Sequence, residues 1–128
     1  MKIVPMTSAI GADVYDADVR KAADVKKIKA AFAKYSVVAV RDQNLTPEEH
    51  IDFAEAMGQI NINRFFTPLD THPNIAIVLK EPDQKGAIGE EWHTDHSYDV
   101  EPALGSILSA IDMPDVGGDT VFSSMAAA

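Results

Sequence analysis

The sequence predicts an α+β, mainly β fold in a single domain. Two segments with helical periodicity fall in the first half of the chain, and short β-branched or alternating segments recur along the second half. The 128 residues suffice for one domain, and a content of 46% hydrophobic and 24% charged residues is typical of a soluble globular protein. This composition disfavours intrinsic disorder and a fibrous repeat.

The first half is expected to alternate strands and helices. Residues 2–4 and 10–14 predict short strands, and residues 18–35 predict a helix because apolar side chains recur there every three or four positions. Residues 36–41 are short, β-branched and bounded by polar residues, which predicts a buried strand.

A second helix is expected to begin at Thr46-Pro47-Glu48-Glu49 and to end near Gly58. Thr46 can cap the helix, Pro47 suits its first turn, and Glu49 completes a capping box. The residues after this helix predict an irregular segment over 59–74, a loop over 83–91 and a turn at 114–118 that includes Gly117 and Gly118. Segments with alternating or β-branched patterns predict strands at 74–80, 92–98, 104–111 and 119–123.

The charge is acidic and uneven. The net charge is −9, which disfavours nucleic acid and anionic membranes as partners. Residues 1–41 hold eight Lys and Arg against four Asp, whereas residues 42–128 hold three against sixteen Asp and Glu, and neither Lys nor Arg follows Lys85. The chain lacks cysteine, a signal-peptide pattern and a long apolar run, so a cytoplasmic protein without disulfides or thiolate metal sites is expected.

The segment Trp92-His93-Thr94-Asp95-His96 holds the candidate metal ligands. On a strand, side chains two residues apart point the same way, so His93 and Asp95 would present an imidazole nitrogen and a carboxylate on one face. These are two of the three ligands of a 2-His-1-carboxylate iron(II) site. His96 would point to the other face. A zinc site using His93, Asp95 and His96 is an alternative, although it needs a tight local turn.

Several motifs together resemble those of the TauD/TfdA family of iron(II)- and 2-oxoglutarate-dependent dioxygenases. Glu91-Trp92-His93-Thr94-Asp95 is followed by Ser106-Ile107-Leu108 and then by Gly117-Gly118-Asp119-Thr120-Val121-Phe122, and upstream features such as Val38-Ala39-Val40-Arg41-Asp42-Gln43 agree in order. The resemblance covers essentially the whole chain. It implies a double-stranded β-helix, or jelly roll, with flanking N-terminal helices, of which residues 1–128 would form the incomplete N-terminal portion of a single domain.

The resemblance also implies roles for individual residues. It implies that His93 and Asp95 are iron ligands and catalytic, and that Thr120 hydrogen-bonds a carboxylate of 2-oxoglutarate. It makes the loops near the site candidates for substrate contact, with Arg64 suited to an anionic substrate and Gly89 as a second contact. Sulfonate-oxidising members place a polar amide a few residues before the His-x-Asp motif, where this chain has Gly89 and Glu90, so taurine is not the expected substrate.

Two further functional residues of the family are expected beyond the end of this chain. They are the distal histidine that completes the iron site and an arginine that pairs with the far carboxylate of 2-oxoglutarate. The charge distribution agrees, since a dianionic co-substrate should meet a cation and residues 86–128 supply neither Lys nor Arg. On this view the chain alone binds iron weakly and has little or no activity.

The resemblance implies a dioxygenase that uses iron(II), 2-oxoglutarate and O₂ to hydroxylate a small organic, acidic substrate, with succinate as the co-product. Two alternatives stay open. The chain could be a non-catalytic scaffold that acts as an oligomerisation or regulatory module, because half a jelly roll would expose sheet edges and apolar surface. It could instead be a zinc-binding β domain. A homo-oligomer is expected.

Overall fold

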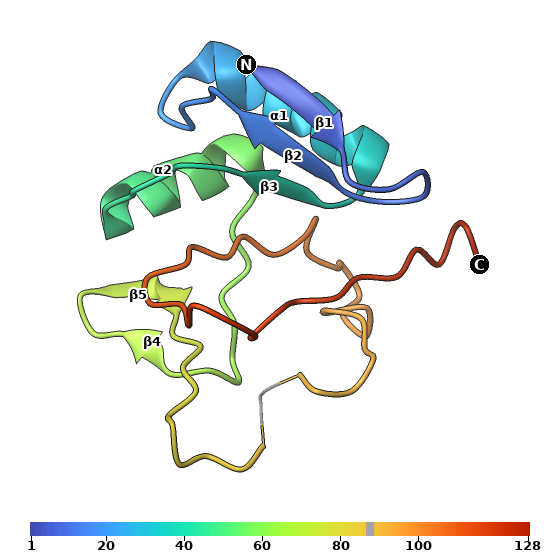
Figure 1. Cartoon of the computed structure of the whole chain (residues 1–128). Coiled ribbons are helices and arrows are strands. Elements are labelled where there is room, and N and C mark those ends of the chain that lie inside the picture. The colour runs from blue at the N-terminus through green and yellow to red at the C-terminus, as the bar shows by residue number, and fades with distance from the viewer. Residues whose placement is uncertain (87–88) are drawn as a thin grey trace.

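The first sixty residues form a small sheet covered by two helices. The computed structural model describes residues 1–86 and 89–128. Strand β1 (Lys2–Pro5) pairs antiparallel with β2 (Ala12–Tyr15), and β2 pairs parallel with β3 (Val38–Val40). The crossover between β2 and β3 is helix α1 (Ala22–Tyr35), and helix α2 (Pro47–Met57) follows β3. Figure 1 shows both helices beside this three-stranded sheet.

The buried core lies between the sheet and the two helices. Ile28 of α1 and Val14 of β2 are fully buried, and Phe53 and Met57 of α2 are each 8% exposed. These residues recur at helical or strand spacing, so each element buries one face. Ile107 is the partly buried residue from the second half of the chain that packs against this cluster. The stable core therefore belongs almost entirely to the first half.

The predicted helices are confirmed, with one change of boundary. Helix α1 begins at Ala22 rather than near residue 18, because Asp18 accepts a hydrogen bond from the Arg20 amide and Lys21 keeps an extended backbone. Helix α2 has the predicted capping box: the Glu49 amide donates to Thr46 Oγ1 at 3.2 Å, and the Thr46 amide donates to the Glu49 carboxylate at 2.9 Å.

The second half contains one short hairpin within the described residues. Strand β4 (Pro68–Leu69) pairs antiparallel with β5 (His72–Ala76). The prediction of a strand at 74–80 was therefore shifted, and the segment 59–74 is not wholly irregular. The tight turn after Leu69 sets the register of β5, and one further hydrogen bond, from the Ile77 amide to the Thr67 carbonyl, continues the pairing.

Three other strand predictions, for residues 92–98, 104–111 and 119–123, were wrong in this structure. A strand needs a partner for its backbone N–H and C=O groups, and these segments pair with no other described part of the chain. Residues 104–128, orange to red in Figure 1, cross the middle of the view without forming a ladder. The sheets here are thus small, and a double-stranded β-helix is not formed by the described residues.

The glycine pair of the predicted turn and the character of the helices can also be compared with the sequence predictions. Gly117 and Gly118 have φ angles of +85° and +72°, which confirms the predicted turn that favours glycine. None of the helices found in residues 1–86 and 89–128 has the length and apolar character that crossing a membrane requires.

Candidate metal centre

The structure brings His93 and Asp95 together. Nε2 of His93 lies 3.4 Å from Oδ1 of Asp95, although the segment that carries them is not a strand. Both side chains are slightly more than half exposed, at 56% and 54%. The predicted proximity of the two side chains therefore holds, while the reason given for it, strand alternation, was wrong.

Hydrogen bonds orient both groups. His93 Nδ1 lies 2.7 Å from the carbonyl oxygen of Glu91, and only a protonated Nδ1 can donate to that oxygen. In the neutral imidazole, Nε2 then carries the lone pair. On the other side, the Ser106 hydroxyl donates to Oδ2 of Asp95 at 2.8 Å, which leaves Oδ1 facing His93. Two electron-rich atoms thus face each other.

This donor pair fits a divalent metal. Two donors each about 2.1 Å from a metal lie roughly 3.0–3.4 Å apart at angles between a right angle and the tetrahedral angle. A neutral imidazole held by a carbonyl on its second nitrogen is the usual arrangement of a metal-binding histidine. Imidazole with carboxylate suits iron(II), and zinc also accepts both donors.

A third ligand is not found in the described part of the chain, where no group of three His, Cys, Asp or Glu side chains could hold a metal ion. His96, the third residue of the zinc alternative, is turned to other partners. Its Nδ1 lies 3.2 Å from Asp99 and its Nε2 3.4 Å from the Asn63 amide. The three-residue zinc site considered from the sequence is therefore not formed.

Gly89 lies directly against the His93 ring. A Cβ atom added at this glycine would stand 3.1 Å from Cε1 of His93 and 3.8 Å from its Nε2. The backbone φ at Gly89 is +78°, in the region that favours glycine. The residue predicted as a substrate contact is thus, in this structure, a close neighbour of the candidate metal ligand.

Neither Arg64 nor Thr120 is hydrogen-bonded or ion-paired to His93 or Asp95 in the described structure. Arg64 is exposed, and its guanidinium reaches the Asp99 carboxylate at 3.5 Å. Thr120 is exposed, and its hydroxyl makes no hydrogen bond to any other residue in the described ranges. The structure therefore gathers His93, Asp95 and Gly89, and within residues 1–86 and 89–128 no hydrogen bond or ion pair joins Arg64 or Thr120 to them.

The sequence matches the family model described as taurine catabolism dioxygenase TauD, TfdA family, over residues 2–128. The chain belongs to the TauD/TfdA family. It is 32% identical to the alpha-ketoglutarate-dependent 2,4-dichlorophenoxyacetate dioxygenase of Cupriavidus pinatubonensis, over 97% of this chain and 50% of that protein.

Two other relatives are named for different substrates. The chain is 25% identical to the alpha-ketoglutarate-dependent sulfonate dioxygenase of Saccharomyces cerevisiae, over 96% of this chain and 33% of that protein. It is 28% identical to the alpha-ketoglutarate-dependent sulfate ester dioxygenase of Pseudomonas putida, over 100% of this chain and 43% of that protein. The chain thus spans half or less of the length of these relatives.

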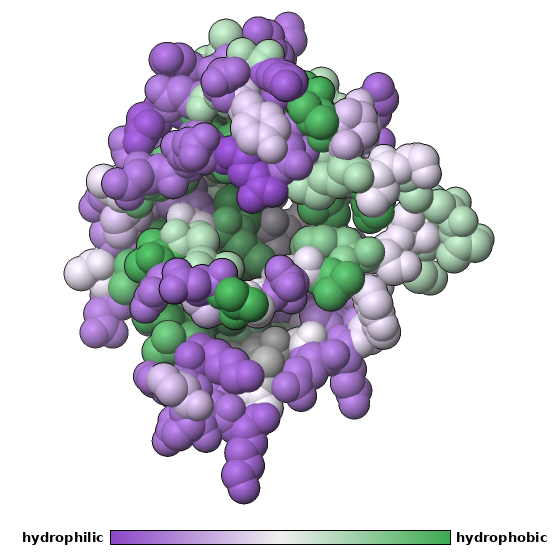
Figure 2. Space-filling model, viewed as in Figure 1, coloured by the Kyte–Doolittle hydropathy of each residue, from purple (hydrophilic) through white to green (hydrophobic). Residues whose placement is uncertain are grey.

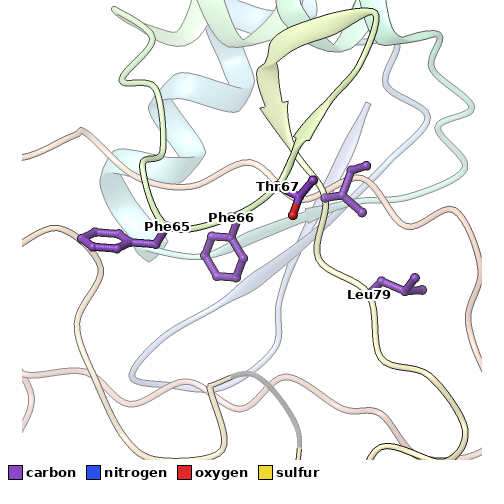
Figure 3. A pocket seen from close by; sticks show the side chains of 5 residues that line it. Phe65, Phe66, Thr67 and Leu79 are labelled. Carbon is purple, nitrogen blue, oxygen red and sulfur yellow. The ribbon is translucent and has the colours of Figure 1, made fainter.

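An apolar hollow lies in the part of this TauD/TfdA-family chain that follows α2. Its volume is about 430 Å³, and its lining residues are Phe65, Phe66, Thr67, Ile77 and Leu79. Figure 3 shows these side chains around the hollow, with both phenylalanines coming from the segment before β4. The Phe65 ring also meets the Tyr98 ring edge-on at 6.3 Å, which connects the hollow to the loop that follows Asp95.

Sequence reasoning missed three residues around the candidate centre. Ser106 stands in a segment noted for its family resemblance, but nothing in the sequence showed that its hydroxyl would reach Asp95 eleven residues earlier. Asn63 and Asp99 hold His96 across 33 and three positions. The clustering of Asn, Asp and His in two loops was the available signal, and it does not indicate which partners meet.

Proposed function

We propose that the chain supplies two iron ligands, His93 and Asp95, to a 2-oxoglutarate-dependent dioxygenase acting on a small organic acid. The observation that supports this most is the lone pair of His93 Nε2 facing the Asp95 carboxylate at 3.4 Å, with the other atoms of both groups already hydrogen-bonded. The three relatives described above are each named as an alpha-ketoglutarate-dependent dioxygenase, and alpha-ketoglutarate is another name for 2-oxoglutarate.

The chain's own residues would prepare this centre before the metal arrives. The Glu91 carbonyl selects the tautomer that leaves His93 Nε2 free, and the Ser106 hydroxyl fixes the rotation of the Asp95 carboxylate. Bound iron(II) would supply O₂ activation coupled to oxidative decarboxylation of 2-oxoglutarate to succinate. Thr120 is proposed to bind a carboxylate of 2-oxoglutarate, a role that requires residues 119–123 to move toward the pair or to pair with further chain.

We propose further that residues 1–128 are the N-terminal portion of one such domain. The chain aligns over nearly its whole length with half or less of each relative. The remaining portion would then supply the third iron ligand and the cation for the far carboxylate of 2-oxoglutarate. It would also supply strand partners for segments that pair with nothing described here.

The substrate is proposed to be a small organic anion with an apolar body. The named substrates of the relatives, a phenoxyacetate, a sulfonate and a sulfate ester, each join an acidic group to an organic part. Arg64 offers a cation, since its side chain is 75% exposed and its contact with Asp99 is long at 3.5 Å. The hollow lined by Phe65 and Phe66 offers apolar surface next to it in sequence.

Anaerobic calorimetric titration of the chain with iron(II) tests the metal site. We expect saturable binding weaker than micromolar that is lost in His93→Ala and in Asp95→Ala. His50→Ala is the matched control, because His50 is a partly exposed histidine of α2, and it should bind iron as the unchanged chain does. Equal binding by the His93→Ala variant would overturn the assignment.

A second candidate function is an oligomerisation or regulatory module. Many large apolar side chains of the second half are exposed, including Val100, Ile111 and Val116 at about nine-tenths or more. Figure 2 shows hydrophobic residues spread across the middle of the visible face. Exposed apolar surface of this kind marks interaction sites. Light scattering coupled to gel filtration would support this function if it shows one discrete oligomer, and a monomer at all concentrations would contradict it.

A further inference from the structure

A polar cluster ties the loop after Asp95 to the segment that lines the apolar hollow. We call it the His96 cluster, formed by Asn63, Arg64, His96 and Asp99. The His96 ring lies between the Asn63 amide, 3.4 Å from Nε2, and the Asp99 carboxylate, 3.2 Å from Nδ1. Asp99 also receives the Arg64 guanidinium at 3.5 Å. Two segments more than thirty residues apart in sequence are joined in this way.

The hydrogen bonds of Asn63 determine which atom donates and which accepts in each hydrogen bond of the cluster. Its Oδ1 accepts from the backbone amides of Phe65 at 2.8 Å and Phe66 at 3.1 Å. The Asn63 NH₂ group must then face His96 and donate to Nε2, because an amide has its donor and acceptor on opposite sides. With Nε2 accepting, the proton of neutral His96 sits on Nδ1 and is donated to Asp99.

Within the His96 cluster, His96 and Asp99 are much better enclosed than the metal pair that the cluster adjoins. The His96 and Asp99 side chains are 17% and 16% exposed, against 56% and 54% for His93 and Asp95. His96 also has a φ of +51°, so the chain turns immediately after Asp95, and the Asp99 amide closes that turn on the His96 carbonyl at 3.1 Å. The backbone next to Asp95 is therefore held by contacts that do not involve a metal.

We infer that His96 and Asn63 are positioning residues for the ligand Asp95, an inference that rests on the proposed function. The turn held by His96 sets where the Asp95 carboxylate stands relative to His93 and Ser106. Asn63 carries this constraint to Phe65 and Phe66, whose amides it binds and whose side chains line the hollow. One asparagine thus links the geometry of a metal ligand to the apolar surface proposed for substrate.

Asn63→Ser separates this role from a general structural one. A serine keeps a short acceptor for the amides of residues 65 and 66 but cannot reach His96. Asn61→Ser is the matched control, since Asn61 is exposed and makes no side-chain hydrogen bond to any residue in the described ranges. The core of the first half contains neither residue, so circular dichroism of both variants should match the unchanged chain.

Nuclear magnetic resonance of the metal-free chain gives the first readout. We expect His96 with its proton on Nδ1, a scalar coupling from the Asn63 amide nitrogen to Nε2, and shifted His93 imidazole and Asp95 carboxyl signals in Asn63→Ser. The same signals should stay in place in Asn61→Ser. A His96 proton on Nε2, or unmoved His93 and Asp95 signals in Asn63→Ser, would overturn the inference.

Cobalt(II) absorption titration gives the second readout. Asn63→Ser should weaken cobalt binding about tenfold, the lower end of the range for residues that orient metal ligands. His96→Gln, whose amide oxygen can accept from Asn63, should bind cobalt more tightly than His96→Ala, and equal affinities would contradict the role of Nε2. If the unchanged chain binds no cobalt, the proposed metal site fails, while the resonance shifts still decide whether the cluster positions Asp95.

Discussion

Replacing Gly89 by alanine probes how tightly the His93 ring is held. The added Cβ would stand 3.1 Å from Cε1 of the imidazole, whereas carbon atoms in contact prefer about 3.5 Å or more. The ring must therefore retreat by roughly 0.4 Å, which nearly exhausts the tolerance of about 0.5 Å within which a preorganised site works. We expect cobalt(II) affinity to fall about tenfold in Gly89→Ala, the lower end of the effect of disturbing the groups that orient a metal ligand.

Backbone strain has to be separated from this steric effect. Gly89 has a φ of +78°, and a left-handed backbone costs an alanine about 1–2 kcal/mol. Gly117→Ala is the matched control, because its φ is +85° and no atom lies within 4 Å of the Cβ it would gain. Both variants carry the strain, and only Gly89→Ala presses on the imidazole.

Titration with cobalt(II), followed by visible absorption, compares the two variants with the unchanged chain. Gly117→Ala should bind as the unchanged chain does, and Gly89→Ala more weakly. Equal affinities in both variants would refute the reasoning, because the contact with His93 would then have no effect on the metal site. The imidazole ¹³C shifts of His93 should move in Gly89→Ala alone.

Three further predictions concern the first half of the chain. Ile28→Ala should lower the free energy of unfolding, measured by urea denaturation, by about 2–5 kcal/mol, because Ile28 is fully buried. Ile111→Ala is the control: its side chain is 89% exposed, so the substitution should change the free energy of unfolding by less than about 0.5 kcal/mol. Thr46→Ala should cost about 1 kcal/mol through loss of the α2 cap, and Thr46→Ser should restore most of it. Hydrogen bonds from Arg20, with one from the Thr46 amide, hold the pKa of Glu49 below its ordinary 4.5. The ionised carboxylate therefore stabilises the fold above that pH. This stabilisation is lost as the pH falls through the lower pKa that Glu49 has in the folded state. Glu49→Gln should therefore flatten the decline of the melting temperature below about pH 5, and an unchanged decline would show that Glu49 is not its source.

The first half was predictable because its signals are local. A helix satisfies its own backbone hydrogen bonds, so the periodicity of residues 18–35 and the capping box at Thr46 and Glu49 were enough to place α1 and α2. The α1 boundary was missed because Asp18 bonds to the backbone of Arg20 instead of capping a helix. The strands of the first sheet were also placed, from short apolar or β-branched runs, but their pairing, antiparallel for β1 with β2 and parallel for β2 with β3, was not predicted.

The candidate site was only partly predictable. Two-residue spacing placed His93 beside Asp95 correctly, even though the segment bends at His96 rather than running straight. The partners that orient the pair could not be found in this way. The Ser106 hydroxyl reaches Asp95, and Asn63 reaches His96, across 11 and 33 positions of the sequence. Contacts between loops depend on the path of the backbone, which no periodicity records.

The strands wrongly predicted at 104–111 and 119–123 lead to a last test. Their residues have strand-like character but no strand partner in the described structure, and most of their side chains are exposed, with Leu108 73% and Val121 71% exposed. Amide hydrogen exchange should therefore be slowest in β2 and α1 and far faster at 104–111 in dilute chain. Slow exchange at 104–111 in dilute monomer would show an internal strand partner and contradict this structure. Protection that grows with protein concentration would instead show pairing between copies, which is how a homo-oligomer of this chain would satisfy those backbone groups.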